Sequence, residues 1–443
     1  MASAMLVAFG LAVVLAGLGL LGRFVGGNWL APAALFPMFW ALVLVVAAAF
    51  HGVLPLHPGG LWVIGSMVAT FQAGALLMHY AASGSGAGAA VAPLDEASRE
   101  ALALRLVRVT AVVVALESVG VVALIRFGGA TFGIEPSLEG LFRLGYQFSA
   151  LRYVGVDEVP GRVRLLLYWT YPAALLGGML AAMARTSLRR LLGVLPLLAA
   201  VVGGIPLASR SGIVYSLVMF VAGFWAVQVW RSRGTYSVLR ARWMVGVVLL
   251  GVGLMAVSIT FLWLRLGIWR RLLVEALVLG TMGDFFGSVA AFTTWFATTD
   301  GGPPALGVFT FAGPFDFLGF ATRLQGVYQM PVDFPGGYSS NIYTVFRGLI
   351  EDFGLATAWG VCFLVGVLST IAYQRCAAGR IRWTVVLSLF YAAALYSHLY
   401  SVFTHNSVIV AWVVVAAVWL WPSRIWAGSG AGDRPPRQVP GAA

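Results

Sequence analysis

Apolar segments of about 20 residues recur along almost the whole of this chain, and each is long enough to cross a bilayer as a helix. Of the 443 residues, 60% are hydrophobic and only 10% are charged. A soluble domain of this size could not bury so much apolar surface. The sequence therefore predicts an all-α, polytopic membrane protein. The first segment lacks a basic start, so we interpret it as a helix rather than a signal peptide.

We expect about eleven transmembrane helices in a single domain over residues 1–422, followed by a flexible cytoplasmic tail over 423–443. Two long segments interrupt the series, 127–164 and 265–346, the second directly before the ninth span. Both are rich in Phe, Leu and Gly, which favours interfacial helices and capping loops on the membrane surface. Within the second, 269–299 is apolar but interrupted by glycines, and whether it crosses the membrane stays open. The expected spans are 3–22, 29–50, 61–80, 107–126, 165–184, 191–209, 212–230, 243–264, 347–373, 383–401 and 407–422.

Every basic residue of the chain is an arginine, and the arginines are distributed unevenly between the loops. Because cytoplasmic loops collect basic residues, the richer side is expected to face the cytoplasm, with the N-terminus outside and the C-terminus inside. The net charge of +12 then needs no nucleic-acid partner. The arginines expected inside are Arg23, Arg99, Arg105, Arg108, Arg185, Arg189, Arg190, Arg231, Arg233, Arg240, Arg242, Arg375, Arg380, Arg382, Arg424, Arg434 and Arg437.

The remaining eleven arginines fall on the opposite side, which the positive-inside rule does not explain. A guanidinium can bind two phosphate oxygens at once, or its side chain can simply snorkel to lipid headgroups. Arg210 is the most constrained, because it lies in a very short turn between two expected spans. Arg265, Arg270 and Arg271 follow another span within about two helical turns. We take these four as candidate pyrophosphate ligands; for the last three, a headgroup anchor is equally open.

Polar residues gather at the start of the ninth span. Arg347 and Glu351 are four residues apart, so they are predicted to pair on one helix face, and Arg347 is a further candidate phosphate ligand. Asp352 is turned about 100° from Glu351, so the two carboxylates should have separate environments. A partly desolvated carboxylate can take a hydroxyl proton as general base, whereas stabilisation of the helix dipole is the alternative role. Which of the two carboxylates is catalytic stays open.

Other motifs narrow the chemistry. His398 and His405 flank the last turn on the outer side, where an imidazole can act as base or hydrogen-bond donor. The sequence contains no Asp-x-Asp, Walker, His-Glu-x-x-His or Cys-x-x-Cys pattern. We therefore expect no metal and no cofactor. Fixed arginines would then stabilise the charge of a phosphate leaving group.

Two stretches resemble motifs of a known family. Residues 338–354 resemble the signature of the bacterial Wzy-type O-antigen polymerases, roughly Asn-x-Tyr-Thr, a short aromatic stretch and Asp-Phe-Gly. Asn341, Tyr343, Thr344 and the run 352–354 match it. Residues 207–212, Leu-Ala-Ser-Arg-Ser-Gly, resemble a helix-hairpin motif that these polymerases share with O-antigen ligases. The resemblance extends over most of the chain by hydropathy alone.

The resemblance implies a fold like that of the GT-C membrane glycosyltransferases. It also implies an undecaprenyl-pyrophosphate-linked oligosaccharide as donor and metal-independent glycosyl transfer at the periplasmic face of the bacterial inner membrane. Asn341, Tyr343 and His405 are expected to bind sugar, and a separate chain-length regulator normally acts as a partner of such enzymes. Ser339 and Ser340 stand where related ligases commonly have histidine, which argues against a ligase. A ligase and a non-enzymatic flippase of lipid-linked sugars remain the alternatives.

Overall fold

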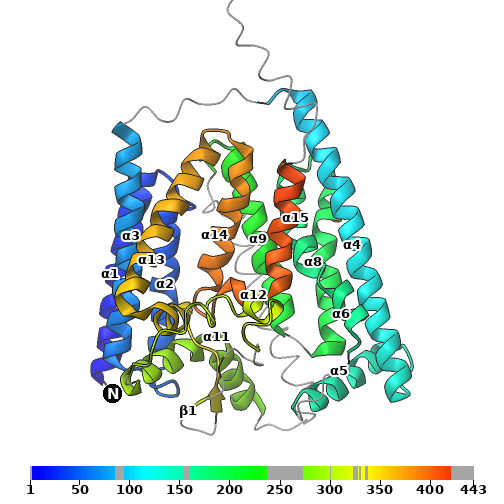
Figure 1. Cartoon of the computed structure of the whole chain (residues 1–443), viewed down its shortest axis with the longest axis horizontal. Coiled ribbons are helices and arrows are strands. Elements are labelled where there is room, and N and C mark those ends of the chain that lie inside the picture. Colours follow the sequence, from blue (N-terminus) through cyan, green and yellow to red (C-terminus); the bar gives the residue numbers. More distant parts are fainter. Residues whose placement is uncertain are drawn as a thin grey trace, which may run out of the picture.

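Figure 1 shows the computed structural model of the chain, a bundle of helices that run roughly along one direction. The structure describes residues 2–84, 94–153, 159–208, 210–236, 273–299, 301–322, 328, 331–334 and 338–420.

Helices form nearly all of the regular structure. A small antiparallel pair of strands, β1 (Val332–Phe334) and β2 (Tyr338–Ser340), is the exception within the described residues, and it pairs Asp333 with Ser339. The helices are α1 (Ala2–Gly26), α2 (Pro32–Ala49), α3 (Pro58–Gly84), α4 (Glu96–Phe132), α5 (Leu138–Tyr153), α6 (Gly161–Leu167), α7 (Thr170–Met183), α8 (Ser187–Leu207), α9 (Arg210–Arg231), α11 (Leu273–Thr298), α12 (Ala312–Phe317), α13 (Val345–Ala377), α14 (Thr384–Tyr396) and α15 (Asn406–Leu420), with short 3-10 turns at Ile381–Trp383 and Val402–Thr404.

The lengths of these helices match the expected membrane spans. Among the described residues, eight helices are long and apolar enough to cross a membrane, and two shorter apolar helices cover 381–396 and 406–419. The all-α, multi-pass architecture is thereby confirmed. The expected span at 243–264 lies outside the described residues, so the total of eleven stays a prediction.

Successive helices alternate in direction, so their connections gather at two ends of the bundle (Figure 1). One end holds the end of α3 and the start of α4, the turn between α7 and α8, the end of α9 and the turn between α13 and α14. We call it the basic end, because the described arginines that we expect inside lie in or near these connections. The other end carries α5, α11, α12 and the strands, and we call it the strand end.

Glycines allow α13, the helix that carries the polar cluster, to pack very closely on α3. A Cβ added at Gly74 of α3 would lie 2.1 Å from the Phe363 carbonyl oxygen, and one added at Gly366 of α13 would lie 2.1 Å from that of Phe71. Small residues at such crossings bring two backbones into contact, which is the usual means of helix association in membranes. The position of α13 is therefore set by close backbone packing.

A second glycine feature separates the start of α13 from the rest of the helix. Gly354 has φ 77° and ψ 163°, so its backbone is not helical and the helix is kinked there. Residues other than glycine rarely adopt a positive φ. The Asp-Phe-Gly run thus ends a short first segment, 345–353, which holds the polar residues and is redirected from the longer apolar segment behind it.

The two long outer segments are only partly helical. The region 127–164 contains the end of α4, which continues to Phe132, and then α5 and α6. The glycine-interrupted stretch forms a continuous helix over its described part, α11, at the strand end (Figure 1). The strands β1 and β2 were not expected. Pro331, Pro335 and two following glycines disfavour a helix there, and β2 packs on α11.

Candidate functional site

The polar residues at the start of α13 lie at the strand end, where several chain segments meet. An extended stretch, 341–344, leads into the helix, and within it Asn341 is half-buried whereas Tyr343 is buried. The first helical amide, Val345 N–H, donates a 2.9 Å hydrogen bond to the carbonyl oxygen of Ser397. This bond fixes the beginning of α13 against the turn that joins α14 to α15.

Arg347 and Glu351 form the ion pair that their spacing predicts. Arg347 Nε and Nη2 donate to Glu351 Oε1 at 3.1 and 3.0 Å. The side chains are only 11% and 21% exposed. Such an enclosed pair resembles a buried salt bridge, in which loss of either partner leaves an uncompensated charge.

Aromatic rings surround the guanidinium of Arg347. Its Cζ lies 3.8 Å from the ring centroid of Tyr328, 4.0 Å from that of Tyr343 and 4.9 Å from that of Trp295. Tyr328 and Tyr343 also contact each other edge to face, with centroids 4.9 Å apart. A cation held over π faces in a desolvated place is stabilised by about 2 kcal/mol. We call Tyr328, Tyr343 and Trp295 the aromatic cage.

The phenols of the cage are neutral. Burial raises the pKa of Tyr328 well above its usual range, and the nearby Glu351 carboxylate raises it further. Burial also raises the pKa of Tyr343.

Glu351 Oε2, the oxygen that does not contact Arg347, is buried without a hydrogen-bond partner among the described residues. An unpaired buried acceptor is unfavourable by about 1–3 kcal/mol, so this oxygen is suited to a hydroxyl donor.

Asp352 has different surroundings, as the helix geometry predicts. It is fully buried, and its two oxygens accept hydrogen bonds from Phe309 N–H at 3.0 Å and Thr310 N–H at 2.6 Å. The backbone carbonyls of Glu351 and Asp352 also accept from the amides of Ala305 and Leu306. Asp352 therefore holds the segment 305–310 on α13. Of the two carboxylates, Glu351 is the one with an oxygen that accepts no hydrogen bond from the described residues.

His405 belongs to a second aromatic cluster at the same end. Its Nε2 lies 3.2 Å from the Tyr400 hydroxyl, and its ring meets that of Tyr215 edge-on at 5.1 Å. Tyr215 in turn stacks on Tyr396, with centroids 3.6 Å apart. These rings tie the start of α9 to the same turn that bonds Val345. His398, in that turn, is half-buried, and its Nδ1 lies 3.1 Å from the Leu395 carbonyl oxygen.

The hairpin turn between α8 and α9 is as short as predicted. Helix α8 ends at Leu207, its C-cap residue Ala208 has φ 44°, and α9 begins at Arg210. The Arg210 side chain lies outside the described residues, as do Arg265, Arg270 and Arg271. Their roles as pyrophosphate ligands therefore stay predictions.

A cavity of about 220 Å³ adjoins the hairpin turn. It is lined mainly by apolar residues of α4, α6, α7 and α8, and Gly212 of the hairpin motif and Ser407 of α15 complete its wall. Arg164 also lines it, and its Nε donates to the Val159 carbonyl at 2.8 Å. The cavity thus combines an apolar body with one cationic side chain.

Sequence reasoning identified Arg347, Glu351 and Tyr343, which the structure brings together, but it missed Tyr328 and Trp295. Both lie in the long segment 265–346, and spacing within one segment cannot show contacts between distant ones.

In the described part of the chain, no three His, Cys, Asp or Glu side chains gather as metal ligands do. Comparisons of the chain with protein-family models, curated proteins and solved structures found no match.

Proposed function

We propose that this protein is a membrane glycosyltransferase that polymerises undecaprenyl-pyrophosphate-linked oligosaccharide repeat units into a surface polysaccharide of the O-antigen kind. The growing chain on its lipid pyrophosphate is the donor, and the incoming repeat unit is the acceptor. The basic end would face the cytoplasm, following the positive-inside rule, so that the strand end faces the periplasm of the bacterial inner membrane.

The observation that carries this proposal is the Arg347–Glu351 pair inside the aromatic cage. Glu351 Oε2 has no hydrogen-bond partner among the described residues and lies beside a fixed cation, which is the arrangement a general base for a sugar hydroxyl needs. In the proposed step the acceptor oxygen forms a bond to the donor's anomeric carbon while Glu351 takes its proton. The bond from that carbon to the pyrophosphate oxygen breaks, and the pyrophosphate leaves with the electron pair.

The leaving pyrophosphate needs cations that are already in place. Arg210 is the first candidate, because it begins α9 at the strand end, and Tyr215 one turn further along contacts His405. Arg265, Arg270 and Arg271 are further candidates from the sequence. Charge grows on the pyrophosphate as the bond breaks, so fixed guanidinium groups stabilise the transition state more than the ground state. Asn341 and Tyr343 are proposed to hold sugar hydroxyls near the cage.

The test is purified protein in liposomes supplied only with lipid-linked repeat units. A polymerase yields a ladder of products, and the Arg210→Ala variant should lose at least about 100-fold in initial rate. Arg126→Ala, at the same end of the bundle in α4, is the matched control and should polymerise normally. A ladder from Arg210→Ala equal to wild type would contradict the assigned role of this residue.

The same assay separates the alternatives. A ligase would leave the repeat units unpolymerised until a lipid A core or other acceptor is added. A flippase would move the lipid-linked sugar across the bilayer without changing its mass. Either result in place of a ladder would overturn the proposed polymerase function.

A further inference from the structure

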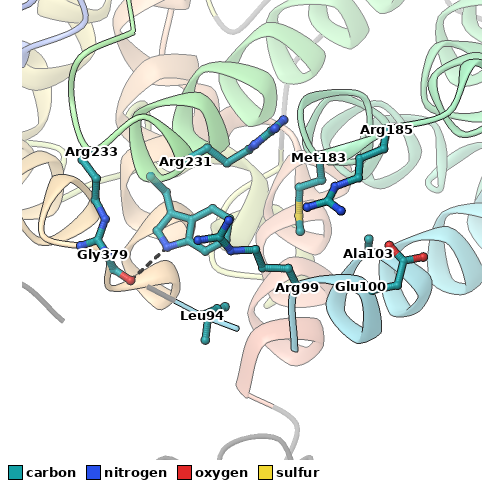
Figure 2. A pocket seen from close by; sticks show the side chains of 10 residues that line it. Leu94, Arg99, Glu100, Ala103, Met183, Arg185, Arg231, Arg233 and Gly379 are labelled. Atoms are coloured by element: carbon teal, nitrogen blue, oxygen red, sulfur yellow. Dashed lines mark hydrogen bonds between the residues drawn. The ribbon is translucent and has the colours of Figure 1, made fainter. Parts of the chain in front are cut away.

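A polar pocket lies at the basic end of the bundle, whereas the aromatic cage lies at the strand end. Figure 2 shows the side chains that line the pocket. Its volume is about 160 Å³, similar to cavities of about 150 Å³ that hold a small organic ring. We call it the arginine pocket. Its lining includes Arg99, Arg185, Trp230, Arg231, Arg233 and Gly379.

The arginines reach the pocket from three separate places in the fold. Arg99 comes from the first turn of α4, Arg185 from the turn between α7 and α8, and Arg231 and Arg233 from the end of α9. In Figure 2 the Arg99 side chain extends across the pocket toward the side formed by Arg233 and Gly379, and Arg185 points inward from the opposite side. Segments distant in sequence thus converge on one small volume.

Backbone contacts hold two of these side chains in place. Arg231 Nη1 donates to the Ala182 carbonyl, and Arg233 Nη1 donates to the Ala378 carbonyl at 2.8 Å. The Trp230 indole donates to the Gly379 carbonyl at 3.0 Å and closes the floor between α9 and the turn after α13. A carbonyl oxygen orients a guanidinium but carries no full negative charge, so the Ala182 contact leaves the positive charge of Arg231 in place.

Carboxylates compensate only part of this charge. Glu96 pairs with Arg185, and Glu100, the carboxylate that lines the pocket, pairs with Arg189 at 2.5 Å. No carboxylate of the described residues lies within ion-pair distance of Arg99 or Arg231. Arg231 is instead repelled by Arg185, Arg99 and Arg190. Both Arg99 and Arg231 are exposed, so an anion from solution or from the membrane surface can reach them.

We propose that the arginine pocket binds a phosphate group. Four guanidinium groups around one cavity offer several pairs of donors in the planar geometry that matches phosphate oxygens. Basic pockets between transmembrane helices near a membrane surface commonly hold anionic headgroups. The phosphate can therefore belong to an anionic phospholipid or to a soluble ligand, and this binding is independent of the chemistry proposed at the strand end.

The experiment measures binding to the purified full-length protein by native mass spectrometry after exchange into detergent. Three probes are titrated separately: phosphatidylglycerol, neutral phosphatidylcholine and inorganic phosphate. We expect phosphatidylglycerol or inorganic phosphate to bind more tightly than phosphatidylcholine, because the choline group balances the charge of the phosphatidylcholine phosphate. This binding should fall about fivefold in Arg99→Gln, the effect of one basic residue beside an anionic surface. Size-exclusion profiles establish that each variant is folded.

Arg108→Gln is the matched control. Arg108 is exposed, lies on the same helix nine residues from Arg99, and therefore projects from the opposite face. If Arg99→Gln weakens only the binding of phosphatidylglycerol, the phosphate belongs to a lipid headgroup. If it weakens only the binding of inorganic phosphate, the phosphate belongs to a soluble ligand. Two outcomes would overturn the proposed site. One is that phosphatidylglycerol and phosphatidylcholine bind equally and inorganic phosphate does not bind. The other is that binding falls equally in Arg99→Gln and Arg108→Gln.

Discussion

Two ion pairs at the strand end have the same helical spacing but very different surroundings. Glu139 and Arg143 of α5 pair at 2.6 Å, and their side chains are 74% and 69% exposed. Arg347 and Glu351 of α13 pair at 3.0 Å, but they are 11% and 21% exposed and lie within the aromatic cage. In an isolated helix, a pair is more stabilising when Glu precedes the basic residue. The exposed pair has this order, whereas the enclosed pair has the reverse order.

The difference shows where a functional charge comes from. The α5 pair is solvated on all sides, and pairs of this kind contribute about 0.3–0.5 kcal/mol. The α13 pair is enclosed by Trp295 of α11, Tyr328 and Tyr343. Because the fold keeps water from this pair, its charges interact more strongly, and Glu351 Oε2 has no hydrogen-bond partner among the described residues. The following predictions test that contrast.

The largest effect is expected for Glu351→Gln. The amide keeps the shape of the side chain but cannot take a proton, so polymerisation should slow by at least about 100-fold, the lower bound for loss of a general base. The measurement is the initial rate of ladder formation in liposomes. Glu139→Gln makes the same chemical change in the exposed pair and should leave the rate unchanged. Equal rates for Glu351→Gln and wild type would remove Glu351 from the mechanism.

A smaller but clear effect on stability is expected for Arg347→Ala. This change leaves Glu351 enclosed without its partner, and breaking such a pair lowers the free energy of unfolding by about 3 kcal/mol. Arg143→Ala, the same substitution in the exposed pair, should change it by no more than about 0.5 kcal/mol.

The two cysteines provide the measurement. Cys362 and Cys376 are both buried and free, so a thiol-reactive dye reports unfolding in detergent as the temperature rises. We expect a lower unfolding midpoint for Arg347→Ala and a midpoint close to wild type for Arg143→Ala. Similar unfolding midpoints for the two variants would mean that enclosure in the aromatic cage does not change how much the ion pair contributes to stability.

Much of the fold follows from local sequence properties. Apolar length predicted the spans, and the arginine bias predicted which connections share an end, because both depend on neighbouring residues. Spacing also predicted that Arg347 would pair with Glu351 and that Asp352 would point elsewhere. The expectation of loops and helices alone between 265 and 346 missed β1 and β2, whose pairing depends on contact with α11.

The surroundings of the site could not be predicted in the same way. Tyr328 and Trp295 contact Arg347 across 19 and 52 residues of chain, the differences between their numbers and 347. No periodic pattern links such positions. The role of Asp352 was also hidden, since its partners are backbone amides, which every residue at 309 and 310 except proline would provide.

The smallest effect is expected for the cage itself. Tyr328→Leu removes a ring 3.8 Å from the Arg347 guanidinium and should lower the free energy of unfolding by about 1–2 kcal/mol. Tyr328→Phe keeps the π face, and because the native phenol is neutral the loss should stay below about 0.5 kcal/mol. The thiol-reactive dye measures the unfolding of both variants.

The same two substitutions made together with Arg347→Ala show how the ring acts. If the ring acts on the cation, the two double variants should be similar in stability, since the coupling to Arg347 is then absent. If the ring only fills space, the difference between Leu and Phe persists without the arginine.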